Sequence, residues 1–202
     1  MSARADSTGA FRTLASGVRS NPGLALLTFS YIAGFAVYGF AEHRPATVSY
    51  LAVVVALVFL VARLNEQVRF SRFVLWGLAI WGFLHLAGGL IPLGDGVLYN
   101  ADLHLPALHY DRLVHAFGFG AATVACWEAL RGHLATGASD VTAAIVAGLA
   151  GMGLGGLNEV VEFGAANLLN ATNVGGYSNT GWDLVFDAIG CAIAAAWVRR
   201  AA

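Results

Sequence analysis

The amino-acid sequence predicts an all-α, polytopic integral membrane protein, a bundle of six transmembrane helices with both termini in the cytoplasm. The first observation is composition: 58% of the 202 residues are hydrophobic and 11% are charged, whereas soluble domains have about 25% charged residues. The second is that the apolar residues form blocks of about 20, the length that crosses a bilayer as a helix. The third is the distribution of arginine, which sets the orientation.

The apolar blocks follow one another along the chain, with short polar connections between most of them. Prolines lie in the first and third connections, where helices are expected to stop. The glycines between positions 148 and 156 favour close helix packing, since small residues let backbones approach. We expect a cytoplasmic arm at 1–23 and one transmembrane domain at 24–200, with spans at 24–41, 47–63, 73–92, 112–130, 141–166 and 181–198.

All eleven basic residues are arginine, and most of them fall on one side of the predicted bundle. With the N-terminus in the cytoplasm, the outer segments hold only Arg44 and Arg112. The inner segments hold Arg4, Arg12, Arg19, Arg63, Arg69, Arg72, Arg131, Arg199 and Arg200. This bias places both termini in the cytoplasm and the protein in the cell (cytoplasmic or inner) membrane. The net charge of −1 gives no basic surface for nucleic acid.

Acidic and histidine side chains occur in helical pairs near the outer ends of three spans. The pairs are Asp111 with His115, Glu159 with Glu162, and Asp183 with Asp187. Spacings of three or four residues put both members of a pair on one helix face. Carboxylates are costly in hydrocarbon unless they are paired, hydrated or bound to a cation. We therefore expect one polar site at the outer face, with His85 of the third span beside it.

The residue types at this site are those that bind a divalent metal ion. Carboxylates and imidazoles without thiolates suit Zn, Fe, Mn or Mg, and helical bundles hold such ions in carboxylate-rich cores. The expected ligands are His115, Glu159, Glu162, Asp183 and Asp187. The expected catalytic or orienting groups are Glu159, His85 and Asp111.

Two structural alternatives stay open for the same residues. Buried polar side chains also fasten membrane helices to one another through hydrogen bonds, each worth about 1 kcal/mol. Asp111 and Asp183 lie near predicted helix starts, so N-capping is a further alternative for these two. Asp187 and His115 lie deeper in their spans, which favours a functional role for them.

A family resemblance joins these motifs. The string Tyr110-Asp111-Arg112-Leu113-Val114-His115, with Gly118 after it, resembles a "YDRxxH" element of the YjdF-like membrane proteins. The similarity covers residues 81–195 and continues through three further motifs, namely His85 with Gly88-Gly89, Glu159-x-x-Glu162, and Trp182-Asp183-x-x-x-Asp187 with Gly190. Where the family has Gly-Asp before Trp-Asp, this chain has Asn179 and Thr180. The last span also has a more distant similarity to VanZ-like proteins. The resemblance implies six spans and a shared outer-face site, and no established reaction.

Three functions are compatible with the pattern. The first is a metal-dependent enzyme, a hydrolase or an oxidoreductase, acting on a lipid or lipid-linked substrate at the outer leaflet. The second is a cation or proton transporter, which the nearly apolar inner halves of the spans disfavour. The third is an accessory or scaffold subunit, with an oligomer or a larger membrane complex as its setting. Membrane lipids are the expected partners in each case.

Overall fold

The computed structural model describes residues 13, 17–105, 108–134, 139–168 and 176–201, so most of the expected arm at 1–23 lies outside the described residues. Within them, six helices are long and apolar enough to cross a membrane. They are α2 (Pro22–Ala41), α3 (Thr47–Val68), α4 (Arg72–Leu90), α5 (Tyr110–Arg131), α6 (Asp140–Leu168) and α7 (Tyr177–Ala201). The predicted all-α membrane fold is confirmed.

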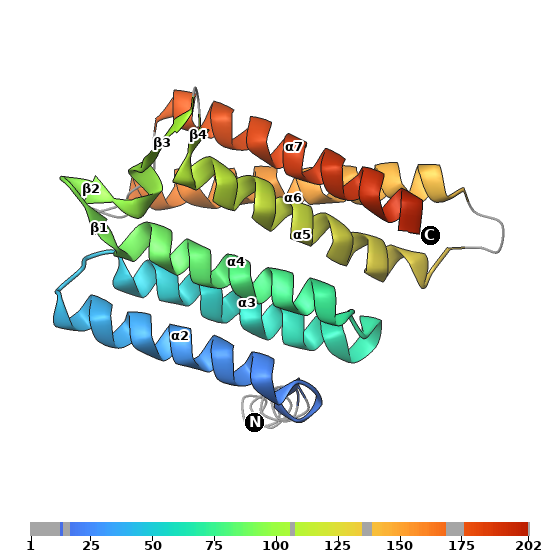
Figure 1. The fold of residues 1–202 in the computed structure, drawn as a ribbon, viewed down its shortest axis with the longest axis horizontal. Helices are drawn as coiled ribbons and strands as arrows, with labels where there is room; N and C mark the ends of the chain where they lie inside the picture. The colour runs from blue at the N-terminus through green and yellow to red at the C-terminus, as the bar shows by residue number, and fades with distance from the viewer. Residues whose placement is uncertain (1–12, 14–16, 106–107, 135–138, 169–175, 202) are drawn as a thin grey trace.

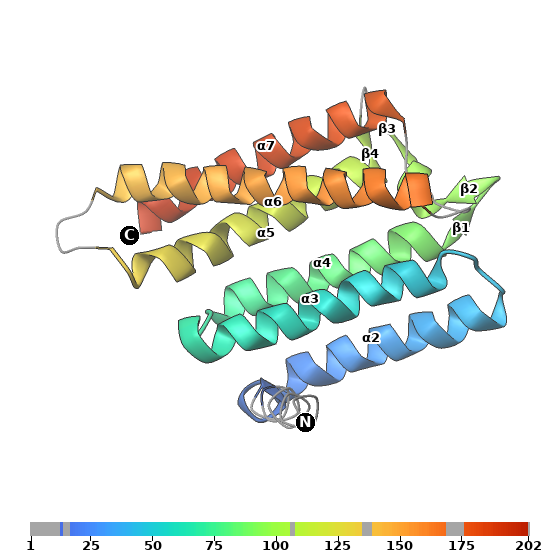
Figure 2. The same cartoon turned by 180° about the vertical axis from the view of Figure 1, so that it is seen from behind.

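The helices lie side by side in one elongated bundle (Figure 1). Helices α5, α6 and α7 pack against one another, α4 packs on α5, and α2 and α3 pack on α4. The view from behind shows the same arrangement, with α7 and α2 on opposite sides of the bundle (Figure 2). Helix α2 starts, and helix α7 ends, at the same end of the bundle. That this end faces the cytoplasm stays a prediction from the arginines.

The connection between α4 and α5 contains two short hairpins that the sequence reading did not predict. Strand β1 (Pro92–Leu93) pairs antiparallel with β2 (Gly96–Val97), and β3 (Asp102–Leu105) pairs with β4 (Leu108–His109), with the 3₁₀ helix η1 (Leu98–Asn100) between them. Helix α4 ends at Leu90 and not at residue 92, because Ile91 precedes a proline and takes an extended conformation with ψ 122°.

The other helices extend beyond their predicted spans, and α3 and α7 extend furthest. Helix α7 starts at Tyr177, one turn before the apolar block at 181–198, and α3 continues to Val68. Hydrophobicity marks the part of a helix that lies in lipid, whereas backbone hydrogen bonding continues through the polar residues at its ends. Helix α3 stops where Arg69 adopts a left-handed conformation with φ 56°.

The end of the bundle at which α2 starts and α7 ends has an apolar core. Its buried residues come from α4 to α7 and the turn before α4, and they are Phe70, Val74, Leu75, Val124, Trp127, Ala143, Ala144, Ala147, Ala194 and Val198. An apolar core of this kind is an unfavourable environment for an ion. The polar site described next lies at the opposite end, beside the hairpins.

Small residues bring α5, α6 and α7 into close contact. A Cβ on Gly190 would overlap the backbone carbonyl of Ala116, and a Cβ on Gly151 would overlap Thr123. Gly155 in the same way leaves room for the carboxylate of Asp187. The packing role predicted for the glycines of α6 is thus confirmed at Gly151 and Gly155.

Candidate functional site

The imidazole of His115 lies at the centre of a buried polar cluster between α5, α6 and α7. Its Nδ1 lies 3.0 Å from Asp187 Oδ1 and 4.0 Å from Glu159 Oε1. Its Nε2 lies 3.8 Å from Asp111 Oδ1. The two ring nitrogens therefore face different sets of carboxylates.

The Nε2 side of the ring is closed by α5 and α7. Asp111, His115 and Asp183 each offer a ligand atom there, and these atoms lie within 4.8 Å of one another. The Asn179 amide donates to Asp183 Oδ2 at 2.5 Å and to Asp111 Oδ2 at 3.3 Å. Asp183 lies in the second turn of α7, which starts at Tyr177. The N-capping alternative is therefore wrong for Asp183.

The Nδ1 side of the ring is closed by α6 and α7. His115, Glu159 and Asp187 form a second group whose ligand atoms also lie within 4.8 Å of one another. Only the hydrogen bond between His115 Nδ1 and Asp187 Oδ1 is short enough to fix the ring. An ionised carboxylate only accepts hydrogen bonds, so with Asp187 ionised the N–H of this contact is on Nδ1.

Some carboxylate oxygens in the cluster are buried without a hydrogen bond. Asp183 and Asp187 are fully buried, and Glu159 is 7% exposed. Within the described part of the chain, Asp183 Oδ1 and Asp187 Oδ2 accept no hydrogen bond. A buried carboxylate oxygen left unsatisfied carries its full desolvation cost, which a proton or a bound cation removes. This arrangement is one that a cation would stabilise.

His85 lies on the other side of the cluster, in an aromatic setting. Its ring stacks on Trp81, with centroids 5.1 Å apart at 23°, and its Nδ1 shares a 2.6 Å hydrogen bond with the Tyr99 hydroxyl. A cavity of about 10 Å³ borders His85, His115 and Glu162, and a polar cavity of that size holds about one water molecule. Asn158 donates to Glu162 Oε1 at 2.7 Å and orients it.

Burial raises the pKa of Tyr99, which η1 places outside the membrane spans, well above its usual range. The folded state therefore favours the neutral phenol, so stability is fully present below about pH 10 and falls as the pH rises through the folded pKa. We expect Tyr99→Phe to lower the free energy of unfolding by about 1 kcal/mol, because a half-buried ring nitrogen of His85 loses its partner. Thermal unfolding in detergent at pH 7 measures this loss.

A control for Tyr99→Phe is Tyr177→Phe, since Tyr177 is 96% exposed. Equal stability of both variants would contradict a structural role for the hydroxyl of Tyr99. If the stability of Tyr99→Phe fell above about pH 10 as steeply as that of the wild type, the raised pKa of Tyr99 would be contradicted.

The structure brings together the residues that the sequence predicted for one site. His115 belongs to both of the three-residue groups of possible metal ligands. Glu162 and His85 line the small cavity together with His115. Whether any of them binds metal or acts in catalysis stays a prediction. Sequence analysis missed Asn179, Asn158, Tyr99 and Trp81. Asn179 lies four residues before Asp183 on the same helix face, but the predicted span started after it.

Charge and aromatic contacts complete the site at the hairpin end of the bundle. The Arg112 guanidinium lies 4.9 Å from the centroid of Trp182, a cation–π contact between α5 and α7. Tyr110 donates from its hydroxyl to the Leu84 carbonyl at 3.1 Å and so fixes the start of α5 against α4.

Fold and site together define a multi-pass membrane protein with a buried acidic and histidine cluster at one end of its bundle. The chain belongs to a family described as "Predicted membrane protein (DUF2238)", whose model matches residues 23–202. The match fits the resemblance to YjdF-like proteins. A search of curated proteins found no match. A search of solved structures found none either.

Proposed function

We propose that this protein is a metal-dependent membrane enzyme that acts on a lipid or lipid-linked substrate at the outer face of the cell membrane. The observation that carries the proposal is the set of buried carboxylate oxygens around His115 that accept no hydrogen bond in the described structure. A hydrogen-bonded network built only to join helices would leave few such oxygens, because each one costs stability.

The tautomer of His115 supports one position for the ion. Where an ionised Asp187 accepts from Nδ1 across their 3.0 Å contact, the lone pair of a neutral His115 is on Nε2, the nitrogen that faces Asp111. A neutral imidazole has one such lone pair. Asp111, His115 and Asp183 would therefore hold the ion, and Asp187 would orient the imidazole, as carboxylates beside metal-bound histidines do.

This proposal divides the predicted site residues by role. Glu159 contributes negative charge on the Nδ1 side of the ring, 4.0 Å from it. Glu162 and His85 border the small cavity beside His115, so they are the groups that would accept or deliver a proton. A bound Zn, Fe, Mn or Mg ion would polarise a phosphoryl or acyl oxygen or activate a water molecule.

A lipid substrate is favoured by the surroundings of the site. Leu113, Phe117 and Val160, on the helices that carry the acidic groups, are at least 41% exposed and would face the bilayer. Their neighbours in a membrane are lipids, so a lipid substrate reaches the site without crossing water. Transport is disfavoured because the opposite end of the bundle is filled by apolar side chains. A relation to VanZ-like proteins, an oligomer and a complex partner stay predictions.

The test is metal analysis joined to a lipid assay. Protein purified without chelator is analysed by inductively coupled plasma mass spectrometry, beside Glu162→Gln and Asp187→Asn. The metal-loaded protein is then incubated with lipid extract from the producing cells, with a chelated sample as control, and the lipids are compared by mass spectrometry. We expect near-stoichiometric metal in the wild type and in Glu162→Gln, less metal in Asp187→Asn, and a lipid change that the chelator prevents.

Two results would point elsewhere. Metal-free wild type whose Asp187→Asn variant loses stability would favour an accessory subunit in which the cluster joins helices. Bound metal without any lipid change would support the site and count against the enzyme.

A further inference from the structure

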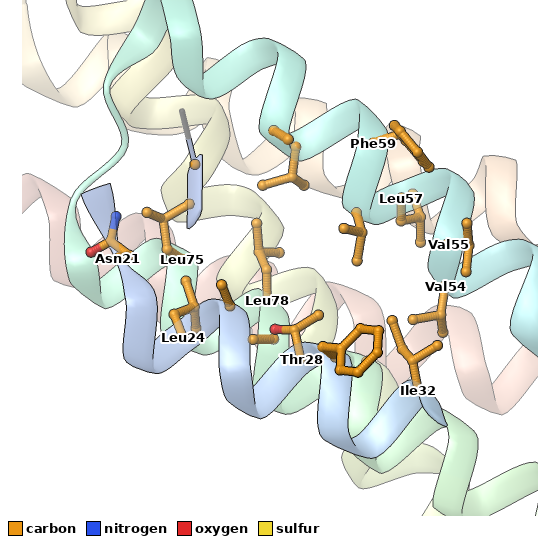
Figure 3. Close-up of a pocket in the computed structure, with 18 of the residues that line it drawn as sticks. Asn21, Leu24, Thr28, Ile32, Val54, Val55, Leu57, Phe59, Leu75 and Leu78 are labelled. Carbon is orange, nitrogen blue, oxygen red and sulfur yellow. The ribbon is translucent and has the colours of Figure 1, made fainter. Parts of the chain in front are cut away.

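A large apolar cavity lies away from the polar cluster, between α2, α3 and α4. Its volume is about 470 Å³, within the range of about 300–1,000 Å³ that small-molecule sites occupy. Figure 3 shows Leu24 and Thr28 of α2, Leu57 of α3 and Leu78 of α4 around it. Apolar cavities of this kind exclude water and accept apolar ligands.

The depth of the cavity limits what can fill it. Its walls come from the part of each helix that lies toward the predicted cytoplasmic side, with Leu24 and Ile32 on α2 and Leu75 on α4. At its deep end it borders Trp81 and Gly82, so Trp81 separates it from the His85 cavity. A ligand at this depth comes from the hydrocarbon of the bilayer.

The other end of the cavity carries polar groups and positive charge. Asn21 and Asn65 line it there. Exposed arginines flank these two residues along the chain, namely Arg19, Arg63, Arg69 and Arg72. In residues 17–21 and 62–72 the sequence has one acidic residue, Glu66, which pairs with Arg63. Basic residues beside a span attract anionic lipid headgroups by about 1 kcal/mol each.

From this combination we propose that the cavity binds one acyl chain of an anionic phospholipid from the arginine-rich leaflet. The chain lies between α2, α3 and α4, with its tip toward Trp81, and the headgroup lies beside Asn21 and Asn65. The apolar wall selects a lipid tail, and the arginines select the charge of the headgroup. This site is separate from the proposed metal site and does not depend on it.

The full-length protein is reconstituted with equal amounts of phosphatidylglycerol and phosphatidylcholine that carry the same acyl chains. Native mass spectrometry then identifies the lipid that stays bound. We expect the wild type to keep phosphatidylglycerol, and Thr28→Trp to lose it because the indole fills the cavity. Leu26→Trp is the matched control, because Leu26 is 67% exposed on the same helix and should leave lipid binding unchanged.

The headgroup preference is tested by charge removal. Arg69→Gln should lower the preference for phosphatidylglycerol about fivefold, the effect of about 1 kcal/mol. Arg200→Gln is the control, because Arg200 lies at the end of α7, across the bundle from α2 (Figure 2). Equal retention of both lipids by the wild type would overturn the anionic preference.

A second measurement on the wild type does not depend on any variant. Phosphatidylglycerol with a photoreactive group near the end of one chain is cross-linked to the protein, and the labelled peptides are mapped. Labelling at Leu57 or Leu78 is expected. Three results would overturn the proposal: labelling only of the outward-facing side chains, unchanged lipid retention in folded Thr28→Trp, or a dimer of two chains that Thr28→Trp abolishes.

Discussion

Asp183→Asn is expected to abolish stoichiometric metal binding, whereas Asp187→Asn is expected to weaken it about 10–100-fold, the usual effect of losing a carboxylate that orients a metal-bound histidine. The difference follows from the two nitrogens of His115. Asp183 shares the Nε2 side with Asp111, and Asp187 accepts the hydrogen bond from Nδ1 at 3.0 Å. Metal titration by calorimetry, with mass-spectrometric metal analysis after dialysis, measures both effects.

The control for this series is Asp95→Asn, an exposed acid in the hairpin connection on the same side of the bundle. It removes one negative charge without touching the cluster, so its metal affinity should equal that of the wild type. If Asp187→Asn abolishes binding and Asp183→Asn keeps it, the ion belongs on the Nδ1 side, with Glu159 and Asp187. Unchanged binding in both variants would remove the proposed site.

Gly190→Ala is expected to cause the largest loss of stability among single-methyl substitutions in the bundle. The added Cβ would overlap the backbone carbonyl of Ala116, and a backbone atom moves only when α5 shifts away from α7. Overpacking of this kind costs about 1–3 kcal/mol, occasionally more. Since α5 and α7 carry His115, Asp183 and Asp187, the same shift should also lower metal affinity. Unfolding of the purified protein in mixed micelles measures the loss.

Gly153→Ala is the matched control on α6, because a Cβ there meets no atom within 4 Å. Alanine in a helix interior is favoured over glycine by about 1 kcal/mol, so this variant should be as stable as the wild type or more stable. A Gly190→Ala protein that unfolds with the wild type would show that α5 and α7 tolerate a wider separation, and the proposed reason for the glycine would be wrong.

Some features of the site could be predicted from the sequence and others could not. The pairs at three- and four-residue spacing predicted that His115, Glu159 and Asp187 face inward, and these three residues are buried and adjacent. The spacing could not predict which carboxylate meets which ring nitrogen, because that depends on the rotation and separation of three helices. Asn179 was missed for a related reason: it lies in a polar turn of α7 that hydropathy does not mark.

The connection between α4 and α5 was predicted least well. Its strands have two to four residues, too few for an alternating pattern, and their pairing depends on turns such as the one at Gly94, with φ 55°. Tyr99 gains its role only because these turns carry it back to His85. Sequence proximity says nothing of that contact, since the two residues are 14 positions apart.

The sequence by itself determined the membrane fold, the six apolar helices and the gathering of acidic residues at one end of them. These properties follow from hydrophobic length and helical period, which act along one segment at a time. The tertiary structure alone decided that His115 lies between two pairs of carboxylates, one pair from Asp111 and Asp183 and the other from Glu159 and Asp187. It also decided that α2, α3 and α4 enclose an apolar cavity. Both features depend on the distances between helices, which are set by side-chain volumes such as the missing Cβ of Gly190 and Gly155.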